Sequence, residues 1–150
     1  MAEMAVRPAA PVRTPTHVWI VGTLALLWNA VGAFDYLATQ MRLEFYMSNF
    51  TAEQLDYFYS FPAWADAAWA LGVWGAFAGA IGLLMRRRWA VWAFALSIVG
   101  LVGTTLYSFV LTDGTEIMGT AAAIFSLVVW IIAILLLWYS WKQAQNGVLR

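Results

Sequence analysis

The chain has 150 residues, of which 63% are hydrophobic and only 11% are charged, whereas a soluble domain is roughly half apolar and about a quarter charged. Its zero net charge gives no electrostatic reason to expect a nucleic-acid partner, and the lack of cysteine excludes disulfides and thiolate metal sites. With His17 as the single histidine, a bis-histidine haem or a His-rich zinc site within one chain is also excluded. We therefore expect no cofactor.

Four long apolar runs follow a short N-terminal tail. The tail, residues 1–16, is rich in proline, arginine and small residues, so we predict that it is disordered and cytoplasmic. Each run is long enough to cross a hydrocarbon layer of about 30 Å, and lipid forces such a segment to be helical. The fold class predicted is all-α, a four-helix transmembrane bundle over residues 17–141, with a second cytoplasmic tail at 142–150. The four runs lie at approximately 17–39, 62–85, 89–111 and 117–141.

The segment between the first two runs contains the sequence NFTAEQLDYFYSFP. Thr51 and Gln54 fit a capping box, in which two side chains satisfy the first free N–H groups of a helix. Apolar residues then recur at helical spacing. We predict a short amphipathic helix over about 52–60, within an interfacial segment at 50–61 on the outer membrane surface. Its interfacial residues would be Phe50, Leu55, Phe58 and Tyr59, with Phe50 and Leu55 at the positions of a hydrophobic staple.

Basic residues fall almost entirely on one side of the predicted membrane. Seven of the eight lie in the two tails and in the turn formed by residues 86–88, and only Arg42 falls on the other side. Positively charged loops remain in the cytoplasm. Both termini are therefore predicted to be cytoplasmic.

Each predicted helix carries a stripe of small or polar residues on one face. Such stripes are the usual packing faces in membranes, because small residues let two backbones approach closely. The second run also contains a literal G-x-x-x-G in GAFAG. We interpret these stripes as the contacts of a bundle. The packing positions singled out are Gly32, Gly72, Gly75, Ala76, Gly79, Gly100 and Ser126.

Two polar residues of the first run have competing interpretations. Asn29, near the middle of the run, would either hydrogen-bond to Ser126 or Thr104, or line a solute path. Asp35 lies about 6 Å from the outer end of the helix and opposes the helix dipole. It points away from the small-residue face and could reach headgroup water or Arg42.

The other acidic residues of the outer side have structural explanations as well as functional ones. Asp66 lies at the depth of Asp35, and the two together could hold a cation or a proton, although their predicted faces diverge. Asp113 and Glu116 fit a helix cap and its partner at the start of the fourth helix. The candidate solute or ion path comprises Asn29, Asp35, Tyr36, Gln40, Asp66, Thr104 and Tyr107.

The chain also resembles a family of small four-helix bacterial inner-membrane proteins across residues 17–147. Members of that family have a long first outer segment and a basic turn after the second helix. They have no established function, although some carry a sugar-transporter label. The resemblance implies the fold and a multi-pass location in the bacterial inner membrane, and it supplies no catalytic residue. It rests on the blocks WNAVGAFDYLATQ, YSFPAWADAAWALGVWGAFAGAIGLLMRRRWA, LSIVGLVGTTLYSFVLTDGTEIMG and LLLWYSWKQAQNG.

Three classes of function stay open. The first is a small transporter or channel for a small polar solute, acting as a homo-oligomer because one bundle leaves little room for a central path. The second is an accessory subunit that docks on a larger membrane complex, or senses lipid through residues 50–61. The third, an enzyme acting on lipid, is least favoured because no nucleophile–base motif is present. The partners expected are the lipid bilayer and one of these assemblies, with no nucleic acid.

Overall fold

The computed structural model describes residues 10–150, and the regular elements within this range are all helices. Within these residues, four helices are long and apolar enough to cross a membrane, which confirms the predicted all-α class with four candidate spans. They are α1 (Thr16–Gln40), α4 (Ala63–Leu84), α5 (Trp89–Leu106) with its π-helical continuation η1 (Tyr107–Leu111), and α7 (Thr120–Gln145). Most of the predicted N-terminal tail, residues 1–9, lies outside the described range.

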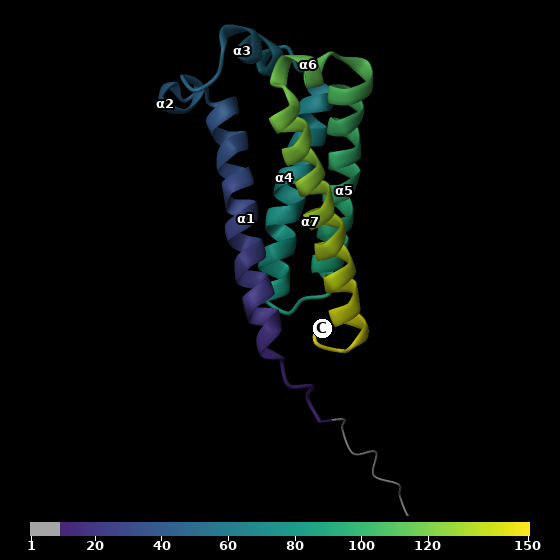
Figure 1. Cartoon of the computed structure of the whole chain (residues 1–150). Helices are drawn as coiled ribbons and strands as arrows, with labels where there is room; N and C mark the ends of the chain where they lie inside the picture. Colours follow the sequence, from purple (N-terminus) through teal and green to yellow (C-terminus); the bar gives the residue numbers. More distant parts are fainter. Residues whose placement is uncertain (1–9) are drawn as a thin grey trace, which may run out of the picture.

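Three short helices gather at one end of the long ones (Figure 1). They are α2 (Glu44–Met47), α3 (Ala52–Tyr59) and α6 (Gly114–Met118). In α3 the capping box is formed as the sequence indicates, since the Thr51 hydroxyl accepts from the Gln54 N–H and the Gln54 side chain accepts from the Thr51 N–H. The sequence did not predict α2, which stands beside the bundle rather than on top of it (Figure 1).

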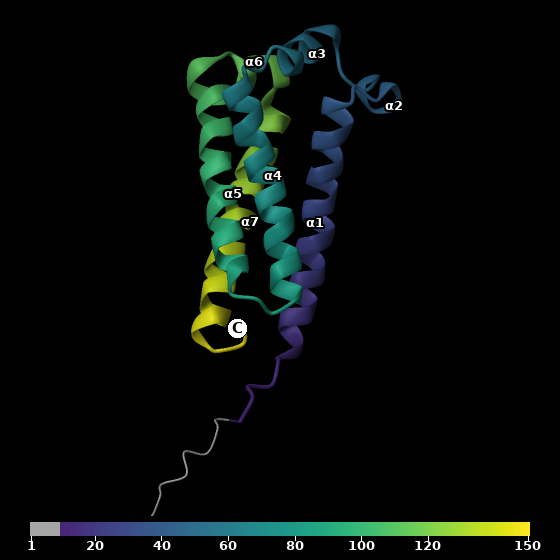
Figure 2. The same ribbon diagram turned by 180° about the vertical axis from the view of Figure 1, so that it is seen from behind.

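The tightest contact of the bundle is between α4 and α5. Seen from behind, α4 lies between α5 and α1 (Figure 2). A Cβ added to Gly100 would overlap the backbone of Gly72 and Ala68, and one added to Gly75 would stand 3.0 Å from the backbone nitrogen of Ser97. The Ser97 hydroxyl donates to the Gly72 carbonyl at 2.6 Å. Residues without bulky side chains therefore set this helix–helix distance, as is usual in membranes.

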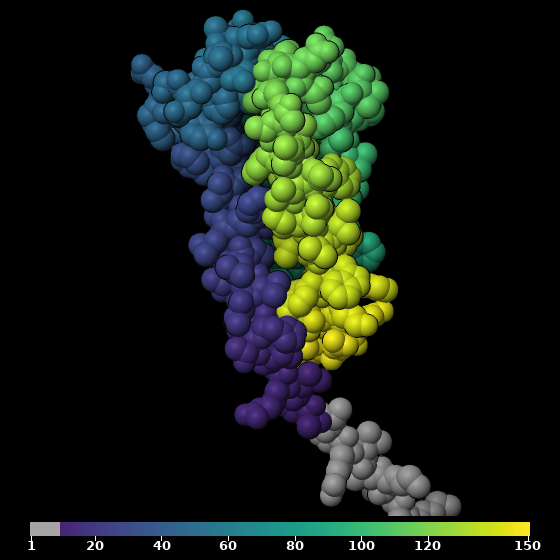
Figure 3. Space-filling model, viewed as in Figure 1, coloured from purple at the N-terminus to yellow at the C-terminus, as the bar shows by residue number. Residues whose placement is uncertain are grey.

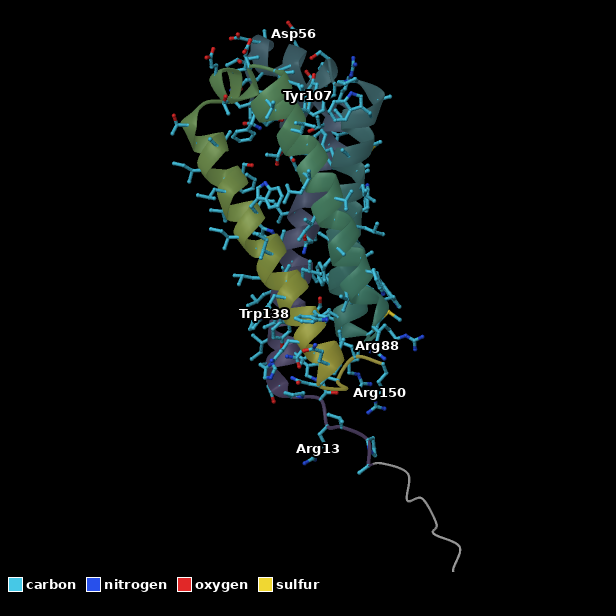
Figure 4. The ribbon with its side chains drawn as sticks, turned by 90° about the vertical axis from the view of Figure 1, so that its right-hand side faces the viewer. Arg13, Asp56, Arg88, Tyr107, Trp138 and Arg150 are labelled. Carbon is cyan, nitrogen blue, oxygen red and sulfur yellow. The ribbon has the colours of Figure 1, made fainter. Side chains whose placement is uncertain are left out.

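Both ends of the described chain lie at what we call the basic end, which carries Arg13, Arg86–Arg88, Lys142 and Arg150. Figure 4 shows Arg13, Arg88 and Arg150 there, with Asp56 and Tyr107 at the opposite end. A buried apolar cluster fills the interior of the basic end. Its fully buried large members are Val18, Leu83, Phe94 and Leu149.

The C-terminal segment, predicted as a cytoplasmic tail at residues 142–150, is partly helical and folds back onto the bundle. Helix α7 continues to Gln145, and the chain then returns to the turn between α4 and α5. Arg150 and that turn exchange two backbone hydrogen bonds, from the Arg88 N–H to the Arg150 carbonyl at 3.0 Å and from the Arg150 N–H to the Arg86 carbonyl at 2.8 Å. The apolar pair Val148 and Leu149 drives this return, because both side chains become buried.

The start of the last spanning helix also differs from the prediction. Helix α7 begins at Thr120 rather than at residue 117, because Gly119 has a φ of +83° and breaks the helix after α6. The expected capping role of Asp113 is wrong, since its side chain makes no cap hydrogen bond. The predicted fourth helix, which was expected to begin near residue 117, therefore starts later, after the separate short helix α6.

Candidate functional site

A cavity of about 520 Å³ lies between α1 and the other three long helices. Small-molecule sites usually measure about 300–1,000 Å³, so this space is large enough for an organic ligand. A smaller hollow of about 200 Å³ adjoins it beneath α3 and α6. The two share the lining residues Phe58, Trp69, Thr104, Met118 and Ser126. Most side chains that line the larger cavity are apolar. Its lining residues with polar side chains are Asn29, Asp35, Tyr46, Ser97, Thr104 and Ser126, besides Trp28 and Trp69.

The cavity reaches the lipid-facing surface along a seam between α1 and α7. Two of its lining residues, Val31 of α1 and Phe125 of α7, are 67% and 60% exposed. Across the seam, the ring of Trp28 lies 6.0 Å from that of Phe125. Figure 3 shows α1 and α7 side by side on this face. A ligand dissolved in the bilayer would therefore meet Val31 and the aromatic pair Trp28 and Phe125 at the entrance.

At the basic end the same seam is closed. His17 Nδ1 of α1 lies 2.6 Å from the Tyr139 hydroxyl of α7, which joins the two helices. Above this contact, Val18, Ala25 and Leu136 belong to the buried apolar cluster. The cavity therefore ends on a packed core toward the basic end.

Asn29 lines the cavity but does not make the predicted hydrogen bond. Its side-chain amide donates to the carbonyl of Ala25 in the same helix at 2.8 Å. The predicted partners, Ser126 and Thr104, also line the cavity, and Thr104 donates to the carbonyl of Gly100. The cavity separates helices that a compact bundle would have brought together. Asn29 and Thr104 consequently donate to backbone carbonyls one turn away in their own helices.

Asp35 also faces the cavity, and its partner is a residue that sequence reasoning missed. The Tyr46 hydroxyl donates to Asp35 Oδ1 at 2.5 Å. Arg42, the partner considered from the sequence, instead lies with its guanidinium carbon 4.1 Å from the centre of the Tyr59 ring. Burial of the Tyr46 hydroxyl, together with its contact with Asp35, raises the pKa of Tyr46 well above its ordinary value. Tyr46 therefore keeps its proton and remains a donor to the carboxylate.

The outer end of the cavity is bounded by four aromatic residues that form a continuous series. Successive ring centres are 5.7 Å apart from Tyr46 to Phe50, 5.3 Å from Phe50 to Phe58 and 6.3 Å from Phe58 to Trp69. All four residues line the cavity, and we call them the aromatic wall. Phe50 and Phe58, predicted as interfacial residues, thus line the cavity.

Gln40, Asp66 and Tyr36 of the predicted path belong instead to the contact between α1 and α4. The Gln40 amide donates to Asp66 Oδ1 at 3.1 Å. The Tyr36 ring lies edge-on to Trp69 and Trp74, with ring centres 5.0 and 6.2 Å away. Asp35 and Asp66 thus have separate partners, and the structure does not bring them together as a cation site.

Tyr107, the last residue of the predicted path, is buried beneath α3. Its ring centre lies 4.7 Å from that of Phe61 and 6.2 Å from that of Tyr57. Tyr57 is itself 7% exposed and donates to the Ser108 hydroxyl, so α3 is fastened to η1 through Tyr57. Leu55, another of the predicted interfacial residues, is half-buried in α3.

Several predicted packing positions border the cavity rather than another helix. A Cβ added to Gly32 would have no atom within 4 Å, so this glycine lies beside open space. Ser126 and Ala76 also line the cavity. Gly79 is different, since a Cβ there would stand 2.8 Å from the ring of Phe94. The small-residue stripes therefore serve two purposes, close packing between α4 and α5 and free volume next to α1.

Within residues 10–150, no group of three or more His, Cys, Asp or Glu side chains is placed to hold a metal ion. Comparisons of the chain with protein-family models, curated proteins and solved structures found no match. What the site can bind therefore follows from its own shape and lining. With its four apolar spans, the chain is an integral, multi-pass membrane protein that encloses a cavity open along one seam.

Proposed function

We propose that the protein is a small transporter that admits a small organic solute with a polar group into the cavity between α1 and α7. The observation that carries this proposal is the one-sided access of the cavity. It reaches the surface along the seam beside Val31 and Phe125, and it ends on a buried core at the basic end. A site that is reached from one half of the bilayer and is closed toward the other side corresponds to one state of an alternating-access cycle.

The distribution of basic residues supports an orientation for this transporter. The basic end holds Arg13, Arg86–Arg88, Lys142 and Arg150, and loops rich in lysine and arginine remain cytoplasmic. We infer that both termini are cytoplasmic, that the membrane is a bacterial inner membrane, and that α3 lies on its periplasmic surface. The cavity then opens toward the periplasmic half of the bilayer. Helix α3 would contact lipid headgroups through its outer side.

The site is contained within one chain. All four long helices contribute side chains to the lining of the cavity, so a homo-oligomer is not needed to form it. Among the described residues that line it, none forms a nucleophile–base pair of the kind that covalent catalysis requires. These features favour transport over an enzymatic function.

Filling the cavity tests the proposal. In Gly32→Phe the new ring would enter the open space beside Gly32, whereas in Ala30→Phe, two residues away, it would point to lipid. Purified variants are reconstituted in liposomes, and uptake is measured for three labelled probes of similar shape: 4-phenylbutylammonium, 4-phenylbutan-1-ol and 4-phenylbutanoate. Protein-free liposomes give the background.

We expect the wild type and Ala30→Phe to accumulate at least one probe above the background, and Gly32→Phe to accumulate none. Equal uptake by Gly32→Phe and the wild type would contradict transport through this cavity. Uptake of no probe by the wild type would contradict the proposed transport as well.

The accessory role has one observation in its favour. Helix α2 stands beside the bundle (Figure 1). Its own residue Phe45 is 68% exposed, and Met41, which precedes the helix, is 66% exposed. Exposed apolar side chains of this kind contact lipid or a partner protein. This role predicts co-purification with a membrane complex in mild detergent, lost in a Phe45→Ser variant. Recovery of the wild-type protein in single copies, with transport intact, would contradict it.

A further inference from the structure

The cavity contains a carboxylate without a cation. Of the described residues that line it, Asp35 is the one that belongs to the set of Asp, Glu, Lys, Arg and His. Arg42, the basic residue nearest in sequence, is held over the Tyr59 ring. A carboxylate in apolar surroundings is costly unless a positive charge or several hydrogen bonds compensate it. The cavity is therefore complementary to a ligand that carries a positive charge.

One oxygen of Asp35 remains free for such a ligand. Oδ1 accepts from Tyr46, whereas no described residue donates to Oδ2. No described side-chain oxygen is both buried and unpartnered, so Oδ2 must be accessible. Because the carboxylate belongs to a residue that lines the cavity, this oxygen is available to a bound ammonium group.

The aromatic wall adjoins the same carboxylate. Tyr46 belongs to the wall and donates to Asp35, and the rings of Phe50, Phe58 and Trp69 continue from it. The faces of aromatic rings attract organic cations, and the attraction is stronger where water is excluded. A carboxylate beside several rings is thus a site for an ammonium group with organic substituents.

The rest of the cavity suits an apolar group attached to that ammonium. From Asp35 the lining continues along α1 to Trp28, a distance of about 10 Å at 1.5 Å per residue. Beyond the wall it includes apolar residues of the other spanning helices, such as Leu101 and Val129. The seam between Trp28 and Phe125 gives this part of the cavity access from the bilayer.

We propose that the cavity binds an amphipathic organic cation, with its ammonium group between Asp35 Oδ2 and the aromatic wall and its apolar body directed toward Trp28. The inference names the solute class of the transporter proposed above and rests on that function for its biological role. Binding itself does not require transport.

Binding of the three matched probes to the protein in lipid nanodiscs tests this inference. 4-Phenylbutylammonium, 4-phenylbutan-1-ol and 4-phenylbutanoate differ in the charge of the head group while sharing the phenylbutyl body. Isothermal titration calorimetry, with empty nanodiscs as the blank, gives each dissociation constant. We expect the cation to bind at least about tenfold more tightly than the alcohol, and the anion to bind most weakly.

Two substitutions test whether Asp35 is the source of the preference for the cation over the alcohol. Asp35→Asn should reduce the affinity for the cation to that for the alcohol, whereas Asp35→Glu should keep most of the preference for the cation. Unchanged affinity for the alcohol shows that the cavity of Asp35→Asn is intact. If that variant does not fold, the order of the three dissociation constants measured for the wild type still tests the inference.

Equal affinity of the wild type for the cation and the alcohol would overturn the inference, and so would an undiminished preference for the cation in Asp35→Asn. Binding of the cation without uptake in liposomes would leave the inference standing and contradict transport. Uptake of the alcohol or the anion in preference to the cation would support transport and contradict the inference that the cavity selects a cation.

Discussion

Gly100 provides the strictest test of how the bundle is held together. A Cβ at this position would stand 2.8 Å from the Gly72 Cα and still closer to two further backbone atoms of α4. Ordinary contacts of a Cβ begin at 3.4 Å, so Gly100→Ala must move α5 away from α4 by more than half an ångström. Backbone atoms cannot rotate away as a flexible side chain could. Forced overpacking of this kind costs about 1–3 kcal/mol.

Gly32→Ala is the matched control, because it makes the same chemical change in a spanning helix. A Cβ there meets no atom within 4 Å, so the substitution should be neutral or stabilise the helix by up to about 1 kcal/mol. The assay is reversible unfolding of both variants by SDS in mixed micelles, followed by circular dichroism. If Gly100→Ala is as stable as Gly32→Ala, then the backbones of α4 and α5 are not in close contact at Gly100.

Three further predictions concern single hydrogen bonds. Thr51→Ala removes a helix cap and should destabilise α3 by about 0.5–2 kcal/mol, seen as faster amide exchange confined to that helix. The raised pKa of Tyr46 means that the folded state holds this proton more tightly than the unfolded state, whose value is near 10.0. The wild type should therefore lose stability as the pH rises above about 10, and Tyr46→Phe should lose less stability over the same range; thermal unfolding measures both. Trp130→Phe, which removes the indole donor to the Thr105 hydroxyl, should cost about 0.6 kcal/mol in SDS unfolding, and an unchanged midpoint would refute a role for this bond.

Features of the fold that depend on local sequence or on lipid were predictable. Four apolar runs of sufficient length leave the backbone no alternative to helices. The capping box at Thr51 and Gln54 is a local pattern, and it forms as predicted. The return of the C-terminal segment also had a signal, because Gly147 followed by apolar Val148 is typical of a helix end that folds back on itself.

The candidate site was harder to predict, because it depends on how separate segments meet. Tyr46 reaches Asp35 only because the chain reverses at Arg42, which has a φ of +52°, and α2 then lies against the end of α1. Gly32 and Gly100 look alike in sequence, since both lie on small-residue faces. One borders a cavity and the other touches a neighbouring backbone. Helical periodicity identifies a face of a helix but not the distance to the next helix.

Cysteine labelling can show whether α1 borders a cavity that admits organic cations. The chain has no native cysteine, so Gly32→Cys and Ala30→Cys each carry a single thiol. Their rates of reaction with 2-aminoethyl methanethiosulfonate, a cationic thiol reagent, are compared in reconstituted vesicles. We predict that Gly32→Cys, beside the cavity, reacts faster than Ala30→Cys and that 4-phenylbutylammonium slows it. Equal rates at the two positions, with no protection by that cation, would mean that α1 does not border a cavity that admits organic cations.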